Sequence, residues 1–231
     1  MGMAGINHLA FITNDMKAQI EFYTQVIGYE LVGIFPFHGV DGATHCFLDS
    51  GNGFLLSFVQ QGEHVEKVDP VYGISHARDV GGPAAGGAMQ HIAMEVDTMD
   101  DMLALRDRIR SAGYAVFGPL PHGITFSMYM GSPEGIQLEF TTTEGCDAMD
   151  PDKWIEADSA SALGMDAEDL KRYRNPPKLE MTGGKVAQPP KETAIPPAPI
   201  PAPMFEKLGY LNDEELKAAM NFADQHETVE A

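Results

Sequence analysis

Residues 6–15 read INHLAFITND, and residues 89–98 read MQHIAMEVDT. Both stretches place a polar residue, a histidine, an aliphatic residue and an alanine in the same order. The alternation of apolar and polar side chains is typical of a strand with two different faces. The repeat therefore predicts two copies of one structural unit, with His8 or His91 at the same place on its first strand.

The segments that follow each stretch extend the repeat. Each is expected to form a helix, which Gly28 or Gly113 ends, and then three strands. The expected elements of the first unit lie at residues 6–12, 15–27, 30–35, 43–49 and 53–60. Those of the second unit lie at residues 90–96, 99–112, 114–117, 124–130 and 136–142. The predicted fold class is α+β, with two paired β-α-β-β-β modules that form a curled mixed sheet.

The chain is expected to consist of one domain and a C-terminal extension. The domain covers residues 1–145, with module one at 5–60, a linker at 61–88 and module two at 89–143. The extension, 146–231, holds a proline-rich stretch at 175–203, which favours extended chain, and a short helix at 212–226. The extension either wraps the domain or pairs with another subunit, and we expect a homo-oligomer.

Composition limits the classes of partner. The 231 residues carry a net charge of −19, and such a field repels phosphate backbones and anionic lipids. We therefore expect neither nucleic acid nor a membrane as a partner. The start of the chain has no basic and apolar signal segment. Together with only two cysteines, Cys46 and Cys146, this predicts a reduced cytoplasmic protein.

Three side chains in the repeat are candidates for a metal site. If the two modules curl around one cavity, His8, His91 and Glu139 point inward from their strands. Two imidazoles and a carboxylate are the ligands of open iron(II) sites. Manganese accepts the same set, and zinc does too but favours four-coordination with one open position. A single histidine on an apolar strand is more often a core residue. A carboxylate between Leu138 and Phe140, however, is costly to bury unless it is paired or binds a metal.

These features make the sequence resemble a known family. Two β-α-β-β-β modules with metal positions on their first and last strands are similar to the vicinal oxygen chelate superfamily, which includes the glyoxalase, bleomycin resistance and extradiol dioxygenase proteins. The stretch HGITFSMYMGSPEGIQLE at 122–139 resembles the type I extradiol ring-cleaving dioxygenases. The four metal positions fall on His8, Ser57, His91 and Glu139, and Ser57 leaves the three-ligand set of those enzymes.

The resemblance also implies which residues handle protons. His122 and Tyr129 match the family's catalytic histidine and tyrosine, and His76 lies upstream of His91 where the family places an acid-base histidine. The alternative for His76 is a solvated loop residue. The remaining histidines match no motif and are predicted to lie in loops or on the surface, at positions 38, 45, 64 and 226.

The resemblance implies an oxidoreductase: an iron(II)-dependent extradiol dioxygenase that cleaves a catechol-like ring with O2, in the catabolism of aromatic compounds. Its partners are then a small aromatic diol and O2, and its cofactor is Fe2+, with Mn2+ as the other ion. Two other functions stay open. A metal-dependent lyase or isomerase of the same superfamily would use a fourth ligand where Ser57 stands, and a non-catalytic small-ligand-binding protein would not need His76 or Tyr129.

Overall fold

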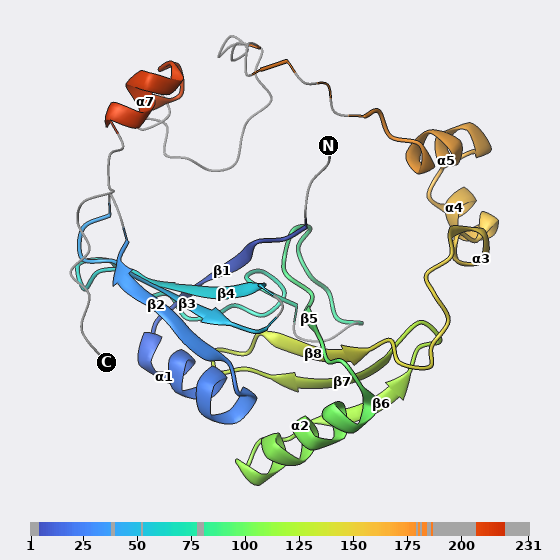
Figure 1. Ribbon diagram of the computed structural model, residues 1–231, viewed down its shortest axis with the longest axis horizontal. Coiled ribbons are helices and arrows are strands. Elements are labelled where there is room, and N and C mark those ends of the chain that lie inside the picture. Colours follow the sequence, from blue (N-terminus) through green and yellow to red (C-terminus); the bar gives the residue numbers. More distant parts are fainter. Residues whose placement is uncertain are drawn as a thin grey trace. The chain divides into compact units, whose positions relative to one another are not determined.

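The repeat forms two separate four-stranded mixed sheets (Figure 1). The computed structural model describes residues 5–37, 40–51, 53–77, 81–178, 180, 182–183, 186 and 207–219. The first module consists of β1 His8–Thr13, α1 Met16–Glu21, η1 Phe22–Ile27, β2 Glu30–Pro36, β3 Thr44–Asp49 and β4 Leu55–Gln60. The second consists of β5 Ile92–Glu95, α2 Met99–Ser111, β6 Phe117–Pro121, β7 Phe126–Gly131 and β8 Gln137–Thr142.

The two sheets have the same topology. Their strand orders are β1-β4-β3-β2 and β5-β8-β7-β6. In each sheet the first strand of the module pairs in parallel with the last, and the other neighbours are antiparallel. This arrangement confirms the prediction of two β-α-β-β-β modules. The sheets are not joined into one closed barrel.

Local signals explain where the helices begin and end. The side chain of Asp15 accepts a hydrogen bond from the backbone of Ala18 and so caps α1. The helix continues into η1, a π-helical stretch, and ends at Gly28, whose φ of 105° is left-handed. Thr98 caps α2 in the same way through the backbone N–H of Asp101.

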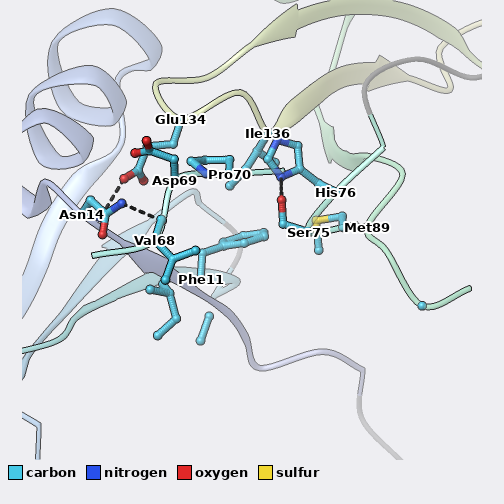
Figure 2. Close-up of a pocket in the computed structure, with 13 residues that line it drawn as sticks. Phe11, Asn14, Val68, Asp69, Pro70, Ser75, His76, Met89, Glu134 and Ile136 are labelled. Carbon is cyan, nitrogen blue, oxygen red and sulfur yellow. Dashed lines mark hydrogen bonds between the residues drawn. The ribbon is translucent and has the colours of Figure 1, made fainter. Parts of the chain in front are cut away.

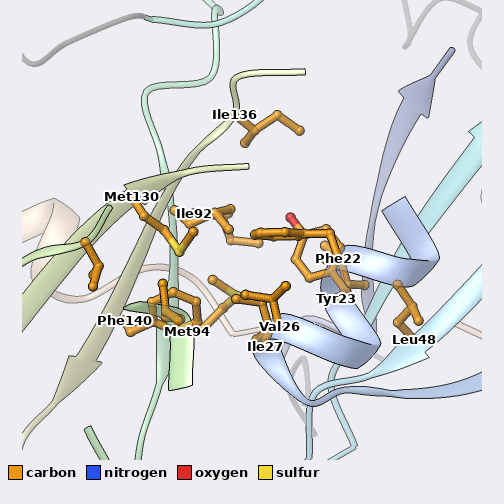
Figure 3. Packing of buried hydrophobic residues seen from close by; sticks show 14 of the residues in the cluster. Phe22, Tyr23, Val26, Ile27, Leu48, Ile92, Met94, Met130, Ile136 and Phe140 are labelled. Atoms are coloured by element: carbon orange, nitrogen blue, oxygen red, sulfur yellow. The ribbon is translucent and has the colours of Figure 1, made fainter. Parts of the chain in front are cut away.

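The two modules share one hydrophobic core (Figure 3). Phe22 and Ile27 of η1 pack in the same cluster as Ile92 and Met94 of β5. Arg108 of α2 reinforces the contact, because its guanidinium donates to the carbonyl oxygens of Thr24 and Gln25. One face of each sheet is therefore buried against the helices, and we call the opposite face the open face.

One strand was predicted at the wrong place. The sixth strand was expected at 114–117 and is found as β6, at Phe117–Pro121. α2 ends at Ser111, and the turn that closes it occupies the start of the expected strand, because the N–H of Tyr114 bonds to the carbonyl of Ile109. At Gly118 the chain approaches β7 so closely that a Cβ would lie 2.5 Å from the carbonyl oxygen of Ser127.

The C-terminal extension begins with three short helices that were not predicted: α3 Pro151–Trp154, α4 Ala157–Ala162 and α5 Ala167–Arg174. Chain contacts group Gly5–Tyr173 into one compact unit. The proline-rich stretch lies almost entirely outside the described residues. The predicted helix at 212–226 is seen as α7, Asp213–Ala219, and its later residues are not described. Among the described residues no helix is long and apolar enough to cross a membrane.

The turn between β7 and β8 ties the second module to the first. The carboxylate of Glu134 accepts hydrogen bonds from the backbone N–H of Asn14 and from the side-chain amide of Gln19, both at 2.7 Å. Asn14 in turn donates from its side chain to the carbonyl of Val68 in the linker, at 3.0 Å. Glu134 has a φ of 55°, which is unusual for a residue other than glycine, and so this turn is held in place by its partners.

Replacing Glu134 by alanine should lower the free energy of unfolding by about 1–3 kcal/mol, because two partly buried donors lose a charged acceptor. Urea denaturation measures the change. The stability of Glu134→Gln should lie between those of the wild-type protein and Glu134→Ala, because glutamine keeps one acceptor oxygen. Glu21→Ala is a matched control, because its ion pair with Lys17 is exposed to solvent and should contribute little to stability. An unchanged unfolding midpoint for Glu134→Ala would contradict the role of this turn.

Candidate functional site

The open face of the second sheet gathers the chemical groups of the second module. Leu138 and Phe140 of β8 point into the core, so Glu139 points to the opposite face. Tyr129 of β7 lies directly across from Glu139 in the strand register. Glu139 is only 7% exposed, and its Oε2 lies 2.9 Å from Nε2 of His91, which immediately precedes β5.

Both repeated histidines are oriented by the residue before them. Nδ1 of His8 lies 2.8 Å from the side-chain oxygen of Asn7, and Nδ1 of His91 contacts the side-chain oxygen of Gln90. An Nδ1–H that donates to an amide oxygen leaves the lone pair on Nε2. The polar residue before each histidine was visible in the repeat, but its role in orienting the ring was not inferred from the sequence.

This orientation makes the second module suitable for a cation. The Nε2 lone pair of His91 faces a buried carboxylate oxygen of Glu139, and that contact is satisfied by a proton or by a metal ion between the two atoms. Imidazole nitrogen and carboxylate oxygen are both donors for divalent iron, manganese and zinc. These two residues therefore fit a divalent metal site as two of its ligands.

The structure does not bring the third predicted ligand to this pair. His8 lies on the open face of β1, is exposed, and contacts the ring of Phe47 edge-on at 5.5 Å. Across the described part of the chain, no group of three or more histidine, cysteine, aspartate or glutamate side chains is close enough to hold a metal ion. The assignment of His8 as a ligand stays a prediction.

His122 and Tyr129 form a hydrogen-bonded pair beside Glu139. The hydroxyl of Tyr129 lies 3.0 Å from Nε2 of His122, which stands in the turn between β6 and β7. Burial is the main cause of a raised pKa for the Tyr129 phenol, the Ser127 hydroxyl acts to lower it, and the Glu139 carboxylate raises it further. The phenol is thus a neutral hydrogen-bond donor at ordinary pH.

His76 is a buried linker residue, which rules out the solvated-loop alternative. It is 7% exposed, and its Nδ1 lies 3.0 Å from the hydroxyl of Ser75. Its Nε2 is buried without a hydrogen-bond partner among the described residues. His76 lines a cavity of about 440 Å³, whose wall also includes Phe11, Met89 and Ile136 (Figure 2). None of the three predicted metal ligands lines this cavity.

The fourth metal position, Ser57, has a different environment. It is fully buried on β4, and its hydroxyl lies 3.2 Å from Nε2 of His45 on β3. His45 was expected in a loop or on the surface, and the structure places it instead within a strand and partly buried. His64, by contrast, is exposed as expected. His38 and His226 lie outside the described residues.

The chain is similar in sequence to proteins of known name. Lactoylglutathione lyase of Neisseria meningitidis serogroup A is 26% identical over 136 residues, which cover 58% of this chain and 86% of that protein. Biphenyl-2,3-diol 1,2-dioxygenase 2 of Rhodococcus globerulus is 27% identical over 132 residues, 57% of this chain and 59% of that protein. The chain thus spans about three fifths of the dioxygenase.

Solved structures agree on the fold. The glyoxylase/bleomycin resistance protein/dioxygenase domain of Frankia sp. EAN1pec superposes with a TM-score of 0.50 at 14% identity, over 62% of this chain and 99% of that chain. A family model matches residues 5–140, which include both modules and the linker between them. The chain belongs to the glyoxalase/bleomycin resistance protein/dioxygenase superfamily.

Proposed function

We propose that the protein is an iron(II)-dependent extradiol dioxygenase that cleaves an aromatic vicinal diol with O2. The observation that carries the proposal is the Tyr129–His122 pair, which stands beside the His91–Glu139 pair on one sheet face. In this proposal His8, His91 and Glu139 hold the metal. An iron(II) ion held there would supply Lewis acidity toward a diol hydroxyl and a common binding point for the diol and O2.

The residues around the metal donors would handle the protons of the substrate. The neutral Tyr129 phenol would donate its single proton either to Nε2 of His122, which lies 3.0 Å away, or to a substrate oxygen. The phenolic proton would then be available for an oxygen that gains negative charge as the ring opens. This pair gives the second sheet an acid-base group next to the carboxylate.

His76 is proposed as the base that takes a proton from the bound diol. An imidazole has one nitrogen that accepts a proton and one that donates, which suits such a base. Its Nε2 is covered in this structure, and the ring of Tyr72 stands edge-on to it at 5.1 Å between centroids. The role therefore requires the linker residues beside His76 to move aside when the substrate binds.

A lyase or isomerase is the second candidate function. Relatives from Neisseria, Synechocystis and Vibrio cholerae bear the name lactoylglutathione lyase or probable lactoylglutathione lyase, which favours it. Against it, Ser57 offers no carboxylate as a fourth ligand and is engaged with His45. A glutathione conjugate also carries carboxylates, and none of the eight strands contains a lysine or arginine to receive them. A binding protein without catalysis would leave the Tyr129–His122 pair without a use.

The metal assignment predicts that His8→Ala, His91→Ala and Glu139→Ala each lose bound metal, because a three-ligand site has no spare donor. Elemental analysis after anaerobic loading with iron(II) measures the stoichiometry. His64→Ala is the matched control, since His64 is exposed and separate from both pairs. Full metal content in any one of the three variants would remove that residue from the ligand set.

The reaction is tested by following oxygen uptake of the iron-loaded protein with a panel of catechols. Tyr129→Phe and His122→Ala should keep the metal and lose about 10²–10⁴-fold in turnover, as expected for acid-base groups. Tyr114→Phe, which alters an exposed tyrosine after α2, should turn over normally. If no diol consumes oxygen and the hemithioacetal of methylglyoxal and glutathione is converted instead, the protein is a lyase.

Ser57, which occupies the family's fourth metal position, leads to a separate prediction. Ser57→Glu should add a carboxylate ligand, so that the protein keeps its metal while oxygen uptake falls, because one position for substrate or O2 is closed. Near-ultraviolet circular dichroism checks that the buried substitution leaves the fold intact. Undiminished uptake by a folded, metal-loaded Ser57→Glu protein would mean that residue 57 does not face the metal.

A further inference from the structure

The C-terminal extension returns to the turn that carries His122. Its first helix, α3, and the segment before it lie beyond the part of the chain that the family model matches. The backbone N–H of Asp147 donates to the carbonyl oxygen of Gly123 at 3.1 Å. The indole of Trp154, the last residue of α3, lies against the same glycine. We call residues 147–154 the brace.

Gly123 is suited to this contact by two properties. A Cβ at this position would lie 3.0 Å from Cη2 and 3.6 Å from Cζ2 of Trp154, so any side chain here would push the indole away. Its φ of 85° is left-handed, a conformation that glycine adopts without strain. The six-membered ring of the indole therefore packs directly against the backbone beside His122.

The brace has internal support of its own. The side chain of Asp150 caps α3 by accepting a hydrogen bond from the backbone N–H of Asp152. Trp154 donates its backbone N–H to the carbonyl oxygen of Asp150 at 2.9 Å. The backbone from which the indole projects is thus fixed by a capped helical turn at one end and by the Asp147–Gly123 hydrogen bond at the other.

The turn that the brace contacts holds the ring of His122. The backbone N–H of His122 donates to the carbonyl oxygen of Thr125 at 2.8 Å, which closes the turn between β6 and β7. His122 is exposed, and its Nε2 lies 3.0 Å from the hydroxyl of Tyr129. A hydrogen bond of an exposed side chain contributes little unless its partners are held in place, because ordering them costs rotamer entropy. A contact that fixes the backbone beside His122 lowers that cost.

We propose that Trp154 is a positioning residue, which fixes the turn at Gly123 so that Nε2 of His122 faces the Tyr129 phenol. The C-terminal extension thus completes a site whose other groups come from the two modules. The inference rests on the proposed function only for what the Tyr129–His122 pair does during turnover. The position of the His122 ring is measurable without any reaction.

The first test reads the hydrogen bond of His122 by NMR, in metal-free protein with 15N-labelled histidine. His122→Ala assigns the signal, and Tyr129→Phe shows where Nε2 resonates once the bond to the phenol is lost. Trp154→Ala should move the Nε2 signal most of the way to its position in Tyr129→Phe. Trp154→Phe, which keeps a smaller ring, should move it less.

Ile155→Ala is the matched control, because Ile155 is the next residue and is 40% exposed against 41% for Trp154. It should leave the Nε2 signal of His122 where it is in the wild-type protein. Circular dichroism checks that each variant is folded. An unmoved signal in folded Trp154→Ala protein, or an equal movement in Ile155→Ala, would overturn the proposal.

A second measurement needs no variant. Trp154 is the single tryptophan of the chain, so tryptophan fluorescence reports this residue alone. An indole packed against Gly123 rotates with the whole protein, and its fluorescence anisotropy should decay slowly. An undocked side chain would instead reorient on the picosecond-to-nanosecond timescale. A dominant fast decay in the wild-type protein would mean that the brace is not docked, and the proposal would fail.

A double-mutant cycle on the iron-loaded protein, with catechol as substrate, tests whether Trp154 acts through His122. Trp154→Ala should lower kcat by about tenfold and leave KM nearly unchanged. In the His122→Ala background the same substitution should cost nothing further, because the group that it positions is already gone. Equal losses in both backgrounds would contradict the proposal.

The two kinds of measurement separate this inference from the proposed function. If the NMR signal and the anisotropy behave as expected while no diol consumes oxygen, the role of Trp154 stands and ring cleavage is wrong. If oxygen is consumed and Trp154→Ala keeps both the wild-type kcat and the wild-type NMR signal, ring cleavage stands and the role of Trp154 is wrong.

Discussion

The shared core between the two modules is the constraint on which the rest of the structure depends. Helices η1 and α2 pack against each other and bury one face of each sheet, as the contacts of Phe22, Ile27, Ile92 and Met94 show. Because neighbouring residues of a strand point to opposite faces, burying Leu138 and Phe140 forces Glu139 outward. The core therefore determines which side chains are available for chemistry before any of them meets a ligand.

The same constraint explains why much of the fold was predictable. The repeat of apolar and polar residues around His8 and His91 defines strand faces, and the apolar stripe of each helix defines what covers them. The misplaced β6 shows the limit of that reasoning. Its position depends on Gly118, which allows close approach to Ser127, and on the turn after α2, where the N–H of Tyr114 bonds to the carbonyl of Ile109. Neither contact leaves a periodic signal in the sequence.

The site was predictable to a lesser degree, for a physical reason. Strand periodicity places His91, Glu139 and Tyr129 on one face, and the structure brings these residues together. Periodicity says nothing about the distance between faces of different modules, and so it could not establish whether His8 approaches the same point. It also could not show that Asn7 and Gln90 orient the two rings or that His45 engages Ser57, because these depend on side-chain conformations.

The two modules carry different side chains at equivalent positions, and this difference connects the fold to the proposed function. A duplicated module offers two equivalent sets of positions, and equal chemistry in both would give a symmetric four-ligand site. Here one copy keeps the carboxylate and the tyrosine, while the other carries a serine tied to His45 and a phenylalanine against His8. Removing a ligand opens a coordination position, and replacing a phenol by a phenyl ring turns a reactive surface into a binding surface. Under the proposed function, this one asymmetry would provide both a coordination position for a second reactant and a surface for the organic substrate, a combination that an oxygenase needs and a four-ligand lyase does not.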